Sequence, residues 1–272
     1  MKLLFFGTFF ILNFTISNGQ PAASPLKKVL ELKIPREGGA NGASVSWHPL
    51  LKKYYAAMAG NVSFCLGVFD AKGKLLSLPE QTTLFDIRGL WYNPHTKTLQ
   101  MNGYSDFGWA EYKLDGKGFP DSVKLLHEGV NQPVDQSVGA FDPQKDVIYF
   151  LNEDGNLDVY DFKEGNYLDE IELTLGKTKK EIDDDEDAAD NYDVLDDYNH
   201  STVVYTAISG ADIGLLNYSE KEIELYNLKD GHLVRKLSLP EEAPANDLLN
   251  FSYCNSTWWL FDTKARTWIG FR

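Results

Sequence analysis

The sequence predicts an all-β fold, a five-bladed β-propeller that the N-terminal strand closes by completing the last blade. Three observations lead to this prediction. Two short motifs recur in step along the chain, one repeat is lengthened by an acidic insertion, and the units at the two ends are each incomplete. Repeats of this kind are typical of propeller blades, which are stacked sheets of four short antiparallel strands.

The first motif is an aromatic residue, one further residue and a proline, and the second is an aromatic residue followed by a polar residue and a glycine turn. Copies of both recur about 40–50 residues apart, except for one step of about 65 residues between the third and fourth units. The first motif occurs at Trp47-His48-Pro49, Tyr92-Asn93-Pro94 and Phe141-Asp142-Pro143, with weaker partners near Tyr205 and Tyr253. The second occurs at Phe69-Asp70, Tyr112, Tyr160-Asp161, Tyr226-Asn227 and, more weakly, Phe271.

The third unit shows how the residues define four strands. Proline at 143 cannot continue a hydrogen-bonded ladder, and Gly155 can supply the positive φ of a tight hairpin. These breaks predict strands at 137–141, 147–151, 157–162 and 167–173. The Asp or Asn after the aromatic residue is expected to cap a turn by accepting bonds from backbone amides. The aromatic residues of both motifs are expected to pack between blades.

The two ends of the chain predict how the ring closes. Residues 26–34 alternate apolar and charged side chains as a single strand, and they belong to no complete unit. The fifth unit has only three predicted strands, at 248–253, 257–261 and 267–271. A spare strand at one end and a missing strand at the other predict that 26–34 completes the last blade, which removes two open sheet edges.

An acidic segment at about 176–198 accounts for the long step between the third and fourth units. It contains ten acidic residues against three lysines, and so carries half of the formal charge of −14. Such charge blocks usually stay solvated, so we expect a flexible insertion in an otherwise single propeller domain over 20–272.

Residues 1–19 have the pattern of a signal peptide: Lys2, an apolar run from Leu3 to Ile16, and small or polar residues at 17–19. The chain is therefore expected to be secreted or periplasmic, with no membrane association after signal removal. Its acidity argues against nucleic acid as a partner. The two cysteines, Cys65 and Cys254, are expected to be unpaired, and the protein to be a monomer.

The repeats resemble those of the broad, divergent β-propeller class that includes YVTN-type and NHL-type units, over about residues 26–272. The resemblance implies a binding site at the mouth of the central channel. This site would lie on the face that carries the loops between blades and the hairpins between second and third strands. It implies no particular chemistry.

Polar and aromatic residues of that face cluster around the second blade. Asp86 and Arg88 alternate across one residue, so both side chains are expected to point the same way. A structural ion pair is the alternative reading of these two. The candidate binding residues are Asp86, Arg88, Tyr104, Asp106, Trp109, Asn131, Asp135 and Asp247. They would form a polar ligand site with an aromatic wall.

These residues predict an exported, non-catalytic module that binds an unknown protein or a small polar ligand, with no cofactor, metal or catalytic residue. A secreted hydrolase is the alternative. A glycosidase would use carboxylates such as Asp86, Asp135 and Asp247, and a metal-dependent lactonase would use Asn131, Asp135, Asn246 and Asp247.

Five Asn-x-Ser/Thr sequons also follow the signal segment. They would be usable in a eukaryotic secretory route, and they lie at Asn61, Asn199, Asn217, Asn250 and Asn255. Asn250 falls inside a predicted inner strand.

Overall fold

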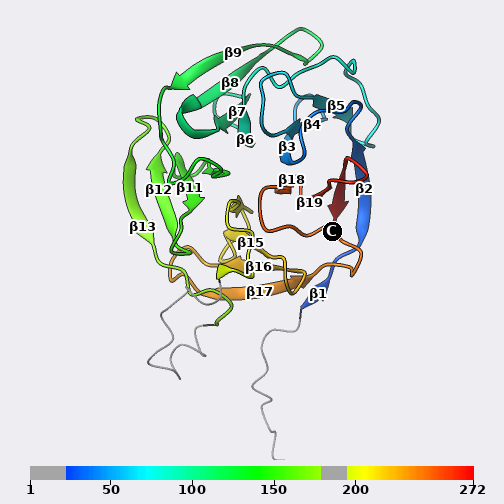
Figure 1. Ribbon diagram of the computed structural model, residues 1–272. Helices are drawn as coiled ribbons and strands as arrows, with labels where there is room; N and C mark the ends of the chain where they lie inside the picture. Colours follow the sequence, from blue (N-terminus) through cyan, green and yellow to red (C-terminus); the bar gives the residue numbers. More distant parts are fainter. Residues whose placement is uncertain (1–22, 179–194) are drawn as a thin grey trace, which may run out of the picture.

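Five antiparallel sheets stand around a central axis in the computed structural model, as Figure 1 shows. The structure describes residues 23–178 and 195–272. The predicted signal peptide and most of the predicted acidic insertion lie outside these residues. The five-bladed propeller predicted from the repeats is confirmed.

The first three blades follow one another along the chain. Blade 1 contains β3 (Gly42–His48), β4 (Lys53–Met58) and β5 (Leu66–Asp70). Blade 2 contains β6 (Ile87–Asn93), β7 (Thr98–Gly103), β8 (Trp109–Leu114) and β9 (Pro120–His127), with a short 3-10 helix η1 (Ser105–Phe107) between β7 and β8. Blade 3 contains β10 (Ala140–Asp142), β11 (Val147–Leu151), β12 (Leu157–Asp161) and β13 (Tyr167–Ile171). Three of these last four strands lie within two residues of their predicted bounds, and the inner strand β10 begins three residues late.

The last two blades include both ends of the described chain. Blade 4 contains β14 (Val204–Tyr205), β15 (Ile213–Asn217), β16 (Glu222–Tyr226) and β17 (Leu233–Ser238). Blade 5 contains β18 (Phe251–Cys254), β19 (Thr257–Asp262), β20 (Thr267–Phe271) and β2 (Lys28–Lys33).

The N-terminal strand closes the ring as predicted. β2 pairs antiparallel with β20, and Leu32 lies opposite Trp268. In Figure 1 the blue N-terminal strand and the red C-terminal strand lie in the same blade. A second N-terminal element was not predicted: β1 (Ser24–Pro25) pairs parallel with β17 at the outer edge of blade 4. The N-terminal segment therefore joins the edges of two blades.

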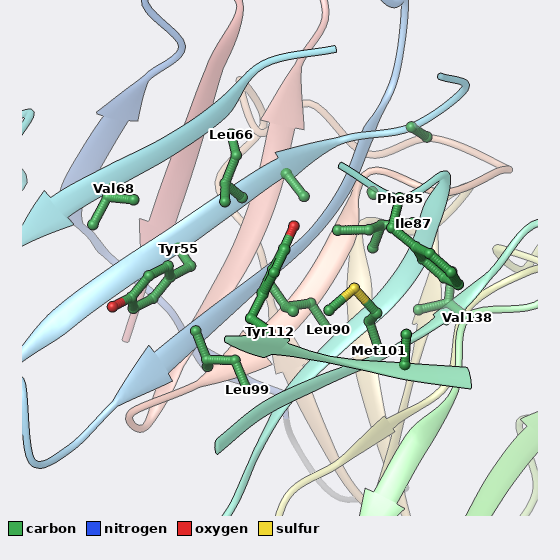
Figure 2. Close-up of a cluster of buried hydrophobic side chains, with 14 of the residues drawn as sticks. Tyr55, Leu66, Val68, Phe85, Ile87, Leu90, Leu99, Met101, Tyr112 and Val138 are labelled. Atoms are coloured by element: carbon green, nitrogen blue, oxygen red, sulfur yellow. The ribbon is translucent and has the colours of Figure 1, made fainter. Parts of the chain in front are cut away.

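Apolar side chains fill each of the five interfaces between neighbouring blades, giving five buried clusters. Figure 2 shows the cluster between blades 1 and 2, where Tyr55 and Val68 of blade 1 face Leu99 and Tyr112 of blade 2. The aromatic residues of both repeat motifs belong to these clusters, as predicted. Burial of side chains of this size stabilises the fold by about 1.5–3 kcal/mol each, before the conformational entropy cost.

The turn residues of the second motif also have the predicted role. The Asp70 carboxylate accepts hydrogen bonds from the backbone amides of Lys72 and Lys74 at 2.8 and 2.9 Å. Asp161 and Asn227 accept equivalent bonds in blades 3 and 4. The nearby turn glycine Gly231 has φ +68°, and a Cβ there would lie 2.0 Å from the carbonyl oxygen of Glu172, so the turn packs on the preceding blade.

Buried asparagines join neighbouring blades through the loops of one face. The Asn102 Oδ1 accepts hydrogen bonds from the backbone amides of Gly89 and Gly139 at 2.9 and 3.0 Å. The Asn250 Oδ1 accepts one from Gly42 at 2.7 Å and so links blade 5 to blade 1. Asn250 has φ +58° and precedes β18, so its predicted place inside that strand was wrong.

Candidate functional site

A cavity of about 1010 Å³ opens at the channel mouth over blades 3, 4 and 5. Three loops between blades and two hairpins between second and third strands form it, which is the face that the sequence resemblance implied. Its lining residues are Val134, Asp135, Gln136, Asn152, Glu153, Leu195, Asp196, His200, Ser201, Tyr218, Asp247 and Leu248. A volume of this size holds a small molecule or a few residues of a peptide.

The cavity is acidic. Asp135, Glu153, Asp196 and Asp247 are exposed residues of its lining, and they come from four different segments. His200 is the one basic side chain among the lining residues that the structure describes, which include no lysine or arginine. Carboxylates that gather in one concave surface attract positively charged groups, and the low-dielectric walls strengthen that attraction.

Three hydrogen bonds fix the position of Asp135. The Tyr104 hydroxyl donates to its Oδ2 at 3.1 Å, and this acceptor raises the pKa of the tyrosine. The Asp135 carbonyl oxygen accepts from the Ser105 amide and from the Gln132 side chain, both at 3.2 Å. Gln132 is itself buried and accepts a hydrogen bond from Asn102 at 2.8 Å. The carboxylate therefore stands on a pre-organised loop, which reduces the entropy lost when a ligand binds.

The loop that carries Asp247 is fixed in a similar way. The Asn199 amide group donates to the carbonyl oxygens of Asn246 and Leu249 at 2.9 and 2.7 Å. The backbone amide of His200 donates to the Asp247 carbonyl oxygen at 3.0 Å. These bonds bring the start of blade 4 against the loop before blade 5, so His200 and Asp247 reach the same cavity.

Tyr218 supplies the aromatic wall of the cavity. It is half-buried in the hairpin between β15 and β16, and its hydroxyl donates to the Asp196 carbonyl oxygen at 2.9 Å. Its backbone amide donates to the Asp197 carbonyl oxygen, also at 2.9 Å. An aromatic ring beside carboxylates is a favourable surface for a cation.

Asp86 and Arg88 form a buried ion pair. Arg88 Nη1 lies 2.6 Å from Asp86 Oδ1, which also accepts a hydrogen bond from the Gly60 amide at 2.9 Å. The Arg88 Nε donates to the Gln136 side chain at 2.6 Å, and the guanidinium lies 4.7 Å from the centre of the Tyr104 ring. The two residues therefore join blades 1 and 2 and support the loop that carries Asp135, while they do not line the cavity.

The remaining candidates lie elsewhere. Trp109 is 0% exposed and stacks on Phe162 at 5.9 Å between blades 2 and 3, so its predicted place as a ligand-facing wall was wrong. Asp106 is exposed in η1, and Asn131 donates hydrogen bonds to the carbonyl oxygens of its own loop. Neither residue lines the cavity.

The inner strands of all five blades line a narrow space of about 60 Å³ below the mouth. Its polar side chains include Ser44 and Ser252, whose hydroxyls lie 3.1 Å apart, and most other lining residues are apolar or aromatic. No carboxylate lines it among residues 23–178 and 195–272.

The described residues contain neither a metal-binding cluster nor a membrane-spanning helix. No three or more His, Cys, Asp or Glu side chains there are grouped so that they could hold a metal ion. No helix in the same residues has the length and apolar character needed to cross a membrane. Cys65 and Cys254 are free thiols, as predicted, and burial raises the pKa of both.

Of the eight candidate residues, the cavity includes Asp135 and Asp247. Sequence reasoning did not select Glu153, Asp196, His200 or Tyr218, although it placed their hairpins and insertion on this face. The one sequence feature that could have indicated these residues is that each loop of blades 3 and 4 on this face contains an acidic or aromatic residue. Similar residues in the loops of blade 2 gave an equally strong signal.

No family model matches the chain, and no curated protein matches it in sequence. Among solved structures, it is similar to the glutaminyl cyclase of Myxococcus xanthus, with 7% identity and a TM-score of 0.55, over 93% of this chain and 98% of that one. It is also similar to a chain in a crystal structure of a nidogen/laminin complex, with 10% identity and a TM-score of 0.42, over 75% of this chain and 66% of that one. The second match thus spans just under two thirds of the nidogen/laminin chain. At these identities the first likeness is one of fold.

Proposed function

We propose that the protein is a binding module whose cavity at the channel mouth takes a positively charged group, such as a guanidinium or an ammonium presented by a protein or a small molecule. The observation that carries the proposal is the lining itself: four acidic residues and Tyr218 line one cavity. Carboxylates accept bidentate hydrogen bonds from a guanidinium, and a tyrosine face attracts a cation.

The hydrogen-bonded loops under the cavity favour a binding site over a surface that is merely solvated. Asp135 and Asp247 both stand on loops whose backbone carbonyls are bonded by side chains or amides of neighbouring segments. A surface of scattered acids would not need such support. A site that is pre-organised before the ligand arrives has higher affinity for the same contacts.

The strength of the interaction between a bound cation and the cavity depends on how exposed the four acidic residues are. Because the four acids are exposed, each ion pair contributes about 0.2–1 kcal/mol, and a cation–π contact at Tyr218 contributes about 0.5–1 kcal/mol. A peptide whose one positive charge makes one such ion pair and this cation–π contact should therefore bind about 3- to 30-fold more tightly than a neutral peptide of the same shape.

Isothermal titration calorimetry tests this directly. The probes are acetyl-Gly-Arg-Gly-amide and the same peptide with citrulline in place of arginine, which keeps the shape and removes the charge. Asp135→Asn should weaken binding of the arginine peptide about 2- to 5-fold and leave the citrulline peptide unchanged. Asp121→Asn removes the same charge from an exposed position on β9 and should change neither. Equal affinities for the two peptides would refute the proposal.

A hydrolase is the second candidate, because Asp135 and Asp247 share one cavity as two catalytic carboxylates would. Against it, Asp86, the third predicted acid, is paired with Arg88. Turnover of a glycoside or lactone substrate that is lost in both Asp135→Asn and Asp247→Asn would favour the hydrolase over the binding module.

A further inference from the structure

The five sequons occupy very different environments in the fold. Asn199, Asn217 and Asn250 are 0%, 7% and 3% exposed. An N-linked oligosaccharide is attached to the side-chain nitrogen of asparagine and is too bulky for a folded interior. These three positions therefore cannot carry a glycan in the folded protein.

The hydrogen bonds of two buried sequons, Asn199 and Asn250, lead to the same conclusion. The Asn199 nitrogen donates to two backbone carbonyls, and the Asn250 nitrogen donates to Asn41 Oδ1 at 3.0 Å and to the Leu248 carbonyl at 3.2 Å. Both N–H groups of each amide are used. Attachment of a sugar would remove one of these bonds and leave a buried acceptor unpaired.

Asn255 is exposed, but its side-chain amide already donates a hydrogen bond. Its nitrogen donates to the hydroxyl of the buried Tyr54 at 2.6 Å, in a turn where Asn255 has φ +50°. The side chain thus points toward the interface of blades 5 and 1. A glycan at this nitrogen would have to grow from beside a packed ring.

Asn61 differs from the other four. It is exposed in the hairpin between β4 and β5, and its Oδ1 accepts hydrogen bonds from the Ser63 amide and hydroxyl at 2.9 and 2.8 Å. Its side-chain nitrogen donates no bond to any residue that the structure describes. The oxygen therefore holds the amide in place, and the nitrogen is left toward solvent.

Exposed apolar side chains adjoin this sequon. Val62 is 43% exposed, and Leu84, whose amide donates to the Val62 carbonyl at 2.9 Å, is 38% exposed. A sugar next to this pair would reduce its contact with water and with other proteins. Because Asn61 belongs to blade 1 and the cavity lies over blades 3 to 5, the glycan would leave the cavity open.

We propose that Asn61 is an N-linked glycosylation site, because among the described residues it is the one sequon whose asparagine is exposed and whose side-chain nitrogen donates no hydrogen bond. The proposal does not rest on the function proposed for the cavity. It requires that the chain enter a eukaryotic secretory pathway; the first nineteen residues predict export, to the periplasm or through a secretory route.

The test is expression of the full chain in an insect or mammalian cell, followed by treatment of the secreted protein with peptide N-glycosidase F and mass spectrometry of its peptides. The expected result is a sugar on Asn61, lost in Asn61→Gln and in Ser63→Ala, the second of which keeps the asparagine. Asn255→Gln, a matched change at the other exposed sequon, should leave the Asn61 glycan in place. Secreted protein with Asn61 unmodified, sugar on Asn199 or Asn250, or a chain that never enters the pathway would each overturn the proposal.

Discussion

Substitutions of Trp109 test whether this residue belongs to the core of the propeller or to its binding face. The side chain is 0% exposed, stacks on Phe162 at 5.9 Å and meets the His127 ring edge-on at 5.2 Å. Truncation of such a side chain leaves a large cavity between blades 2 and 3. Trp109→Ala should therefore lower the free energy of unfolding by about 3–5 kcal/mol.

A conservative change at the same position should cost much less. The Trp109 Nε1 is buried without a hydrogen-bond partner in the described part of the chain. Phenylalanine keeps most of the stacking surface and removes that unpaired donor, so Trp109→Phe should cost less than about 1.5 kcal/mol. Urea unfolding followed by circular dichroism measures both differences.

The matched variant for binding is Tyr218→Leu. Tyr218 lines the cavity and is only half-buried, so its loss should cost less than about 1 kcal/mol of stability. Affinity for the arginine peptide should fall about 2- to 5-fold, the value of an exposed cation–π contact. Trp109→Phe should leave that affinity unchanged. Loss of binding in Trp109→Phe at wild-type stability would show that the core placement of this residue is wrong.

Three further predictions test the blade architecture by chemical or thermal unfolding. Gly231→Ala should destabilise by more than about 1 kcal/mol, because φ is +68° and Cβ would clash with the preceding blade, whereas Gly116→Ala, where nothing lies within 4 Å, should be nearly neutral. Equal effects of the two would argue against the close contact between blades. Backbone amides lower the pKa of Asp115, so its carboxylate adds stability above the unfolded pKa that is lost as pH falls through the folded one. Asp115→Asn should accordingly lower Tm at pH 7, and the difference should close as pH falls through the lowered pKa of the folded state; a gap that persists in stronger acid would contradict this origin. Glu224 is 0% exposed, lies 2.9 Å from Lys236 and accepts hydrogen bonds from the Tyr198 and Tyr226 hydroxyls. Because Lys236 keeps Glu222 at 3.1 Å as a second partner, Glu224→Gln should cost about 1–3 kcal/mol, and a cost near zero would contradict charge-assisted hydrogen bonds at this position.

The fold was predictable because its signals are local. Pro143 and Gly155 mark two of the turns of the third unit, and the alternation of 26–34 marks one strand in isolation. The two-residue strand β1 was missed since Ser24 and Pro25 are too few to show any periodicity, and only the position of the β17 edge makes them pair.

The site was less predictable because it depends on how the ring is assembled. Trp109 and Tyr218 both lie beside predicted hairpins of the same face, and the sequence does not show which ring turns inward. Tyr218 lines the cavity, and its hydroxyl donates to the Asp196 carbonyl oxygen, a contact between two loops that no local sequence pattern marks. Asp135 and Asp247 are more than one hundred residues apart and meet through the closed ring.

A crystal structure of the full chain grown with acetyl-Gly-Arg-Gly-amide tests the central claim most directly. The account predicts the guanidinium inside the cavity over blades 3 to 5, within hydrogen-bond distance of Asp135 or Asp247 and against the ring of Tyr218. Density for the peptide on the outer strands or at the opposite end of the channel, with this cavity empty, would contradict it.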